Sequence, residues 1–190
     1  MAFDKQGKLT TADARLILIP YYAWCHRGSG NMKVWIAQDL KATRPSEPAT
    51  LASMSKIQAS TRTSALGSIN DRLVPKNAND RSIPYYHWWP KNNSTEWITY
   101  TFPEEATVQS STVYWFDDQP WGGCSTPESW KIYYKDASGN WQEVTHADNY
   151  PTVKGSACTV NFDPVKTKEM KLEVKLPEKL SSGVFEWSVK

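Results

Sequence analysis

Residues Ser129–Val144 read SWKIYYKDASGNWQEV, and this stretch decides the fold class. Trp130, Ile132 and Tyr134 recur with a period of two, which predicts a strand with one buried face. The DASGN segment that follows has the composition of a tight turn, and WQEV can pair back onto the first strand. The stretch therefore predicts a β-hairpin and an antiparallel β-domain around it.

The same pattern recurs on both sides of this hairpin. The clearest strand is MKLEVKL, where Met170, Leu172, Val174 and Leu176 point to one face. Further strands are predicted at Ser55–Ser60, Glu96–Phe102, Thr107–Phe116, Cys158–Phe162 and Val184–Lys190, with Phe185, Trp187 and Val189 sharing a face in the last of them. About eight short strands separated by turn residues predict an all-β sandwich or jelly roll.

Charge and hydropathy exclude two classes of function. The net charge is +2 and acidic and basic residues are interspersed, whereas an electrostatic nucleic-acid binder concentrates its Lys and Arg residues. No apolar run approaches the roughly 20 residues of a membrane helix. The first sixteen residues lack the basic and then apolar pattern of a signal peptide.

The N-terminal part reads as a separate piece of β-structure. Arg15–Trp24 and Met32–Ile36 predict an apolar hairpin, which requires a sheet to join because a lone hairpin is marginal in water. A segment with two prolines follows at Asp39–Ser55. We predict a hairpin of a preceding sandwich at 1–40, a linker at 41–52 and a domain at 53–190. Exposed strand edges in the hairpin predict some self-association.

The cysteines leave two alternatives open. Cys25, Cys124 and Cys158 lie far apart and form no C-x-x-C motif. Cys124 and Cys158 are either paired in a disulfide or present as two buried thiols.

Residues 53–190 resemble the galactose-binding-like jelly roll of discoidin domains and family 32 carbohydrate-binding modules. The resemblance lies in the order of YHWWP, TEWITYTF, VYWFDD, the hairpin quoted above, VNFDPVKTKEMKLEV and the closing VFEWSV. It implies an all-β galactose-binding-like jelly roll whose loops contact carbohydrate.

Residues 1–40 resemble the end of the β-sandwich that follows the catalytic barrel in glycoside hydrolase family 127, the β-L-arabinofuranosidase group. The stretch ADARLILIPYYAWCHRGSGNMKVWI carries this resemblance. It implies the C-terminal end of a larger hydrolase in the periplasm or outside the cell, with the catalytic domain as one partner. Cys25 does not match the nucleophile of that group.

The stretch YYHWWP, Tyr85–Pro90, is the first candidate binding segment. We predict that Trp88 plugs the sandwich, whereas His87 and Trp89 face a ligand, because an aromatic face packs on the C–H groups of a sugar while polar groups bind its hydroxyls.

The loop FDDQPWGGC offers the same chemistry. Asp117 and Asp118 are candidate acceptors and Trp121 is a candidate platform, with two glycines that permit close backbone approach. The alternative for both aspartates is that they cap backbone amides in a turn.

The resemblance also implies a structural calcium. By position, Asp71 and Glu186 would supply carboxylates and backbone carbonyls the remaining ligands. The family glycine after the aspartate is Arg72 in this chain.

These observations predict a non-catalytic carbohydrate-binding accessory domain of a secreted glycoside hydrolase, with a glycan or plant polysaccharide as ligand and no required cofactor. The adjacent pairs Glu104–Glu105 and Asp117–Asp118 would point to opposite faces of a strand, so neither suits glycoside hydrolysis. Two alternatives stay open: a structural module that packs on the catalytic domain without binding sugar, and a discoidin-type adhesion module.

Overall fold

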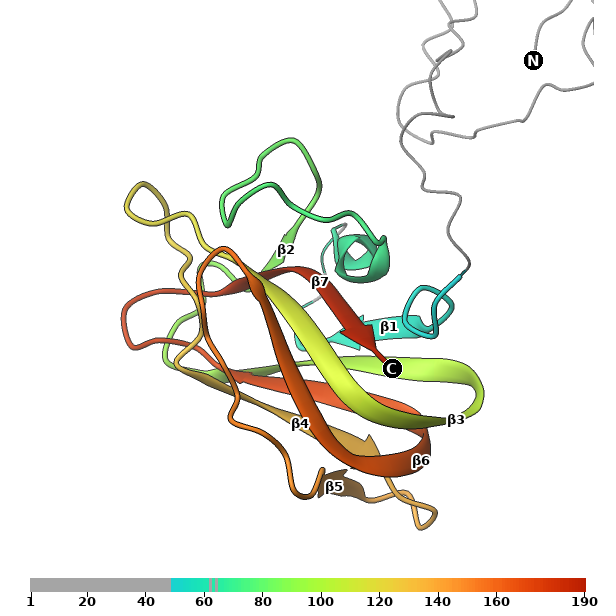
Figure 1. Ribbon diagram of the computed structural model, residues 1–190. Helices are drawn as coiled ribbons and strands as arrows, with labels where there is room; N and C mark the ends of the chain where they lie inside the picture. Colours follow the sequence, from blue (N-terminus) through green and yellow to red (C-terminus); the bar gives the residue numbers. More distant parts are fainter. Residues whose placement is uncertain (1–48, 62, 64) are drawn as a thin grey trace, which may run out of the picture. The chain divides into compact units, whose positions relative to one another are not determined.

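Two long strands organise this domain (Figure 1). In a computed structural model, residues 49–61, 63 and 65–190 are described, and Ala49–Lys190 form one compact unit. The predicted hairpin and most of the predicted linker lie outside the described residues. The elements are β1 (Lys56–Ala59), the 3-10 helix η1 (Leu66–Asn70), β2 (Tyr86–His87), β3 (Thr95–Phe116), β4 (Ser129–Lys135), β5 (Trp141–Glu143), β6 (Ala157–Lys175) and β7 (Gly183–Val189).

Strands β3 and β6 are longer than the sequence predicted, because each joins two expected strands into one. They pair with one another antiparallel from Thr95↔Lys175 to Tyr114↔Ala157. The register shifts between Thr101 and Ala106 and again between Val108 and Ser110. Such irregularities bend a strand without ending it, so both strands run from one layer of the sandwich into the other.

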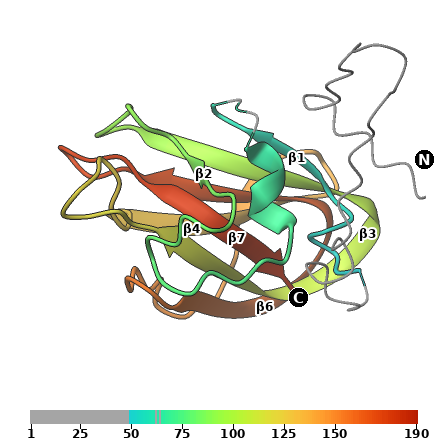
Figure 2. The same cartoon turned by 90° about the horizontal axis from the view of Figure 1, so that it is seen from above.

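The pairing of β3 defines the two layers. In one layer, the first part of β3 pairs with β1 on one side and with the last part of β6 on the other. That part of β6 also pairs with β4, and β4 pairs with β5. The last part of β3, Ser111–Phe116, pairs with β7, which in turn pairs with β2. All pairings between these strands are antiparallel, and η1 lies against β7 and β1 (Figure 2). The predicted all-β antiparallel architecture is confirmed.

Period-two patterning places the core where it was predicted. Every inward position of MKLEVKL is fully buried, as are Ile98, Tyr100 and Trp187. The Tyr100 and Trp187 rings stack at 4.1 Å with an interplanar angle of 11°, and the Tyr100 hydroxyl donates to the Trp187 carbonyl at 2.7 Å. These contacts join the two layers.

One prediction about β7 is wrong. Phe185 does not share a face with Trp187 and Val189, because β7 carries one extra residue at this point. Glu186 pairs with Tyr114 and Val184 with Trp115, so Phe185 lies opposite no residue of β3. Phe185 instead packs with Phe116 in a second buried cluster outside the main core. This cluster supports the site described below.

Both described cysteines are free, buried thiols, so the disulfide alternative is excluded here. Cys158 belongs to the core between the layers, whereas Cys124 belongs to the second cluster. In the part of the chain that the structure describes, no helix has the length and apolar character needed to cross a membrane.

Candidate carbohydrate-binding site

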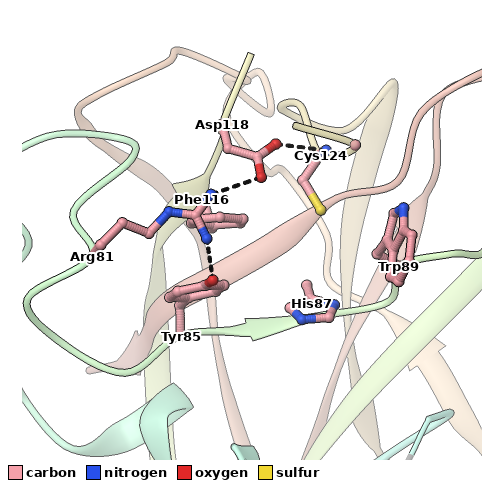
Figure 3. A pocket seen from close by; sticks show the side chains of 8 residues that line it. Arg81, Tyr85, His87, Trp89, Phe116, Asp118 and Cys124 are labelled. Atoms are coloured by element: carbon pink, nitrogen blue, oxygen red, sulfur yellow. Dashed lines mark hydrogen bonds and ion pairs between the residues drawn. The ribbon is translucent and has the colours of Figure 1, made fainter. Parts of the chain in front are cut away.

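A pocket of about 180 Å³ lies where β2 and the end of β3 meet the following loops (Figure 3). Arg81 and Trp89 stand on opposite sides of it, with Tyr85 and His87 below and Asp118 and Cys124 above. Its lining consists of Arg81, Tyr85, His87, Trp89, Phe116, Asp118, Gly123 and Cys124.

Strand alternation decides which rings of YYHWWP reach this pocket. Tyr86 and Trp88 point inward and are fully buried, and the Trp88 indole donates to the Ser60 hydroxyl at 3.1 Å. The intervening residues, His87 and Trp89, therefore point outward and line the pocket. Trp89 is 59% exposed, so much of its indole is available to a ligand. The predicted burial of Trp88 is confirmed.

The floor of the pocket is aromatic and rests on the second cluster. The Tyr85 and Phe116 rings stack at 3.9 Å with an interplanar angle of 10°, and Phe185 meets both rings edge-on. The Arg81 guanidinium lies 5.1 Å from the Tyr85 ring centroid and 5.0 Å from that of Phe116. Cation–π contacts of this kind hold the guanidinium in place at the pocket wall.

Asp118 connects this arginine to the loop above the pocket. Its Oδ2 accepts a hydrogen bond from Arg81 Nη2 at 2.9 Å, and its Oδ1 accepts one from the Cys124 amide at 2.8 Å. Arg81 also donates to the Tyr85 hydroxyl. Charge-assisted hydrogen bonds are the stronger ones, so the pair fixes the relative position of two loops.

Gly122 and Gly123 allow the loop to lie close to these side chains. A Cβ at Gly122 would lie 2.0 Å from the Asp118 carboxylate carbon. A Cβ at Gly123 would lie 2.6 Å from Cδ1 and Nε1 of the Trp89 indole. Any side chain at these two positions would therefore displace Asp118 or Trp89, as the paired glycines in the sequence suggested.

The environment of the pocket disfavours charge on its remaining titratable groups. Burial lowers the pKa of His87, and nearby Arg81 lowers it further, while Asp118 opposes both effects. Burial raises the pKa of the Cys124 thiol to about 12, and Asp118 adds to the rise. His87 Nδ1 is buried with no hydrogen-bond partner, which further disfavours a charged imidazole.

The structure brings together His87, Trp89 and Asp118 from the predicted set, whereas Asp117 and Trp121 do not line the pocket. Asp117 accepts hydrogen bonds from Lys154 Nζ at 2.6 Å and from the Gln119 and Thr126 amides, which is the capping role considered as the alternative. Trp121 is 89% exposed at the apex of the same loop.

Sequence reasoning missed Arg81, Tyr85, Phe116 and Cys124 as lining residues. Alternation within YYHWWP carried a signal for Tyr85, since it shares the phase of His87 and Trp89. No sequence signal identified Arg81, because it reaches the pocket from a loop whose path depends on tertiary contacts.

Asp71 and Glu186 lie close together where η1 leads toward β7. Burial, with a smaller contribution from the neighbouring Asp71, raises the pKa of Glu186 to about 8. Burial likewise raises the pKa of Asp71. Glu186 accepts a hydrogen bond from the Arg72 amide at 3.0 Å, and Asp71 accepts one from the Leu73 amide at 2.8 Å. Within the described ranges, no group of three or more His, Cys, Asp or Glu residues is arranged to hold a metal.

Two family models match different parts of this chain. The family model of the NedA-like, galactose-binding domain matches residues 77–172, which include every residue that lines the pocket. The chain belongs to this family. The model of the glycoside hydrolase family 127 C-terminal domain matches residues 3–37. Both resemblances inferred from the sequence are thereby confirmed.

Solved structures share the fold of this galactose-binding-like domain at low identity. A chain from the Streptococcus pneumoniae β-galactosidase BgaA matches with a TM-score of 0.61 and 18% identity, over 72% of this chain and 91% of that chain. The family 32 module of Clostridium perfringens NanJ, in complex with galactose, matches with a TM-score of 0.54 and 15% identity, over 74% and 96%. The C. perfringens module CpGH89CBM32-5, in complex with GalNAc-β-1,3-galactose, matches with a TM-score of 0.52 and 14% identity, over 73% and 97%.

Proposed function

We propose that this domain binds a neutral carbohydrate in the pocket between Arg81 and Trp89, as a non-catalytic accessory domain of a secreted glycoside hydrolase. The observation that carries the proposal is the combination of an exposed indole and a fixed Arg81–Asp118 pair across one small cavity. The ligand is a glycan or plant polysaccharide outside the cell or in the periplasm, and the chemistry of catalysis belongs to the parent hydrolase.

The pocket offers the two kinds of surface that a pyranose or furanose ring requires. The Trp89 face takes the C–H groups of the ring, in the manner of apolar packing on aromatic side chains. The hydroxyls find donors and acceptors on the opposite side, in the guanidinium, the Asp118 carboxylate and the Tyr85 hydroxyl.

Charge balance favours a neutral sugar over a uronic acid or an amino sugar. Arg81 and Asp118 neutralise one another at 2.9 Å, and the lowered pKa of His87 keeps its ring uncharged at neutral pH. A charged ligand would have to separate this pair or bring an unpaired charge beside it, at a desolvation cost.

Isothermal titration of the full chain with galactose, L-arabinose and oligosaccharides of each sugar tests this proposal. We expect saturable binding that Trp89→Ala abolishes and that Trp141→Ala on β5 leaves unchanged. Trp141 is a matched control because its ring packs against Lys135 and Lys171 on the sheet, outside the pocket lining. Failure of every neutral glycan to bind would refute the proposal and favour a scaffold role.

We further propose that Asp71 and Glu186 hold a structural calcium. Two carboxylates that are partly removed from water, with Asp71 contributing to the raised pKa of Glu186, fit a hard divalent cation, which would relieve their repulsion. Backbone carbonyls and water would have to supply the remaining oxygen ligands.

Thermal unfolding with calcium or with chelator tests this site. Calcium should raise the Tm of the wild-type chain, since a ligand that binds only the folded state stabilises it. Glu186→Gln should remove that response, while Lys166→Gln, at an exposed position of β6, should retain it. Equal calcium responses of wild type and Glu186→Gln would exclude the site.

A further inference from the structure

The apex of the loop between β3 and β4 carries an indole that the pocket does not use. We propose that Trp121 forms a second sugar subsite, so that the domain binds a chain of at least two neutral sugar residues with one residue in the pocket and the next on Trp121. This inference rests on the proposed carbohydrate-binding function and specifies its ligand as an oligosaccharide rather than a single sugar.

The loop that presents Trp121 is held by hydrogen bonds at both ends of its apex. The amides of Trp121 and Gly122 both donate to the Asp118 carbonyl at 3.0 Å, and Asp118 and Cys124 exchange further hydrogen bonds across the loop. Gln119 Nε2 donates to the Gly122 carbonyl at 2.5 Å. An aromatic ring on such a fixed backbone loses little conformational entropy when it contacts a ligand.

A neighbouring loop supports the same apex from the other side. Lys154 Nζ donates to Asp117 Oδ1 at 2.6 Å and to the Gln119 carbonyl at 3.0 Å. Asp117 and Asp118 therefore tie the base of the loop in two directions, to Lys154 and to Arg81. The backbone that carries Trp121 is thus held by hydrogen bonds and ion pairs, although the ring itself is 89% exposed.

Trp121 is adjacent to the pocket in the chain and in space. Asp118 and Gly123, which flank it, both line the pocket. The Cα atoms of Trp121 and Gly123 are at most about 7 Å apart, because two residues span no more than that. Gly123 in turn lies against the Trp89 indole. The backbone of Trp121 therefore lies beside the Trp89 indole, with the glycine pair between them.

The size of the pocket explains why a second surface is needed. Its volume of about 180 Å³ is smaller than the roughly 300–1,000 Å³ of sites that enclose a drug-sized ligand. One sugar ring fills it, so the remainder of a glycan must lie on the surface beside it. An exposed indole at this place can pack on the next ring, whose C–H face matches it.

Affinity as a function of chain length tests the inference. The full chain is titrated with mono-, di- and trisaccharides of the sugar that binds in the panel of galactose and arabinose ligands. For the wild type we expect the disaccharide to bind about tenfold more tightly than the monosaccharide, a ratio that corresponds to about 1.4 kcal/mol. In Trp121→Ala this ratio should fall below about twofold, with monosaccharide affinity unchanged.

Three further variants separate the possible results. Trp121→Tyr should restore most of the ratio because it restores an aromatic face, and Trp141→Ala should leave the ratio at its wild-type value. Trp89→Ala should abolish the binding of every ligand, whatever its length. Monosaccharide binding with the same length dependence in wild type and Trp121→Ala would overturn the second subsite while leaving the proposed function intact. No binding of any ligand by the wild type would overturn both.

Discussion

Substitution of the two adjacent glycines should separate stability from binding. In Gly122→Ala the new methyl group would lie 2.0 Å from the Asp118 carboxylate carbon, so the carboxylate must move. The carboxylate would then lose its hydrogen bond from the Cys124 amide and its ion pair with the half-exposed Arg81. The Cys124 amide would be left buried and unpaired. Hydrogen bonds to charged groups contribute about 1.5–3 kcal/mol each, and exposure of Arg81 reduces its share. We therefore expect a loss of about 2–4 kcal/mol in the free energy of unfolding.

Gly123→Ala should behave differently, although the two positions are neighbours. Its methyl group would meet the Trp89 indole at 2.6 Å, and that indole can turn toward solvent because it is 59% exposed. The free energy of unfolding should therefore change by less than about 1 kcal/mol. Sugar affinity should fall at least as far as in Trp89→Ala, since the platform is misplaced.

Urea unfolding followed by tryptophan fluorescence measures the first quantity, and sugar titration measures the second. Gly67→Ala is the control, because a Cβ at Gly67 meets nothing within 4 Å. Equal unfolding midpoints for Gly122→Ala and Gly67→Ala would refute the argument that Asp118 is fixed by its partners. A Gly123→Ala variant that loses several kcal/mol would show that Trp89 supports the fold.

Three further predictions concern the core and the carboxylate pair. In chelator, the free energy of unfolding of the wild type should fall as pH rises from about 4.5 to about 8, because folded Glu186 retains a proton that the unfolded chain has released. Urea midpoints measured across this range should show no such decline in Glu186→Gln. Parallel pH profiles of wild type and variant would contradict the role of Glu186. Tyr100→Phe removes the donor to the Trp187 carbonyl and should lower the free energy of unfolding by about 1–3 kcal/mol, as a chemical denaturation curve will report; no change would mean that water replaces the hydroxyl. Cys124 and Cys158 are buried with raised pKa values, so iodoacetamide at pH 8 should modify them only after unfolding; peptide mass spectrometry showing rapid labelling of either in the native chain would contradict this.

Much of the fold follows from period-two patterning, because burial on one face of a strand constrains every second residue. The inward face of MKLEVKL and the contrast between Trp88 and Trp89 were both predictable in this way. Two features were not. The union of Glu96–Phe102 with Thr107–Phe116 depends on bulges that the pattern does not encode. The position of Phe185 depends on a bulge within β7 that the period-two pattern does not encode.

The candidate site was predictable only in part for a similar reason. His87, Trp89 and Asp118 have residue types that suit a sugar and positions in polar loops, and they do meet in one pocket. Arg81 joins them through cation–π contacts with Tyr85 and Phe116, which bring the loop before β2 against the end of β3. Asp117 and Asp118 look alike in the sequence, but the backbone turns them toward different loops.

The path of β3 and β6 through both layers has a consequence for how the domain loses its structure. Strands β3 and β6 are shared by both layers, so unfolding of one layer would disrupt the central hydrogen-bonded ladder of the other. The domain should consequently come apart in a single cooperative event. The glycine-bearing loop that follows β3 is anchored to one of these shared strands, so it should keep its shape until the whole domain unfolds.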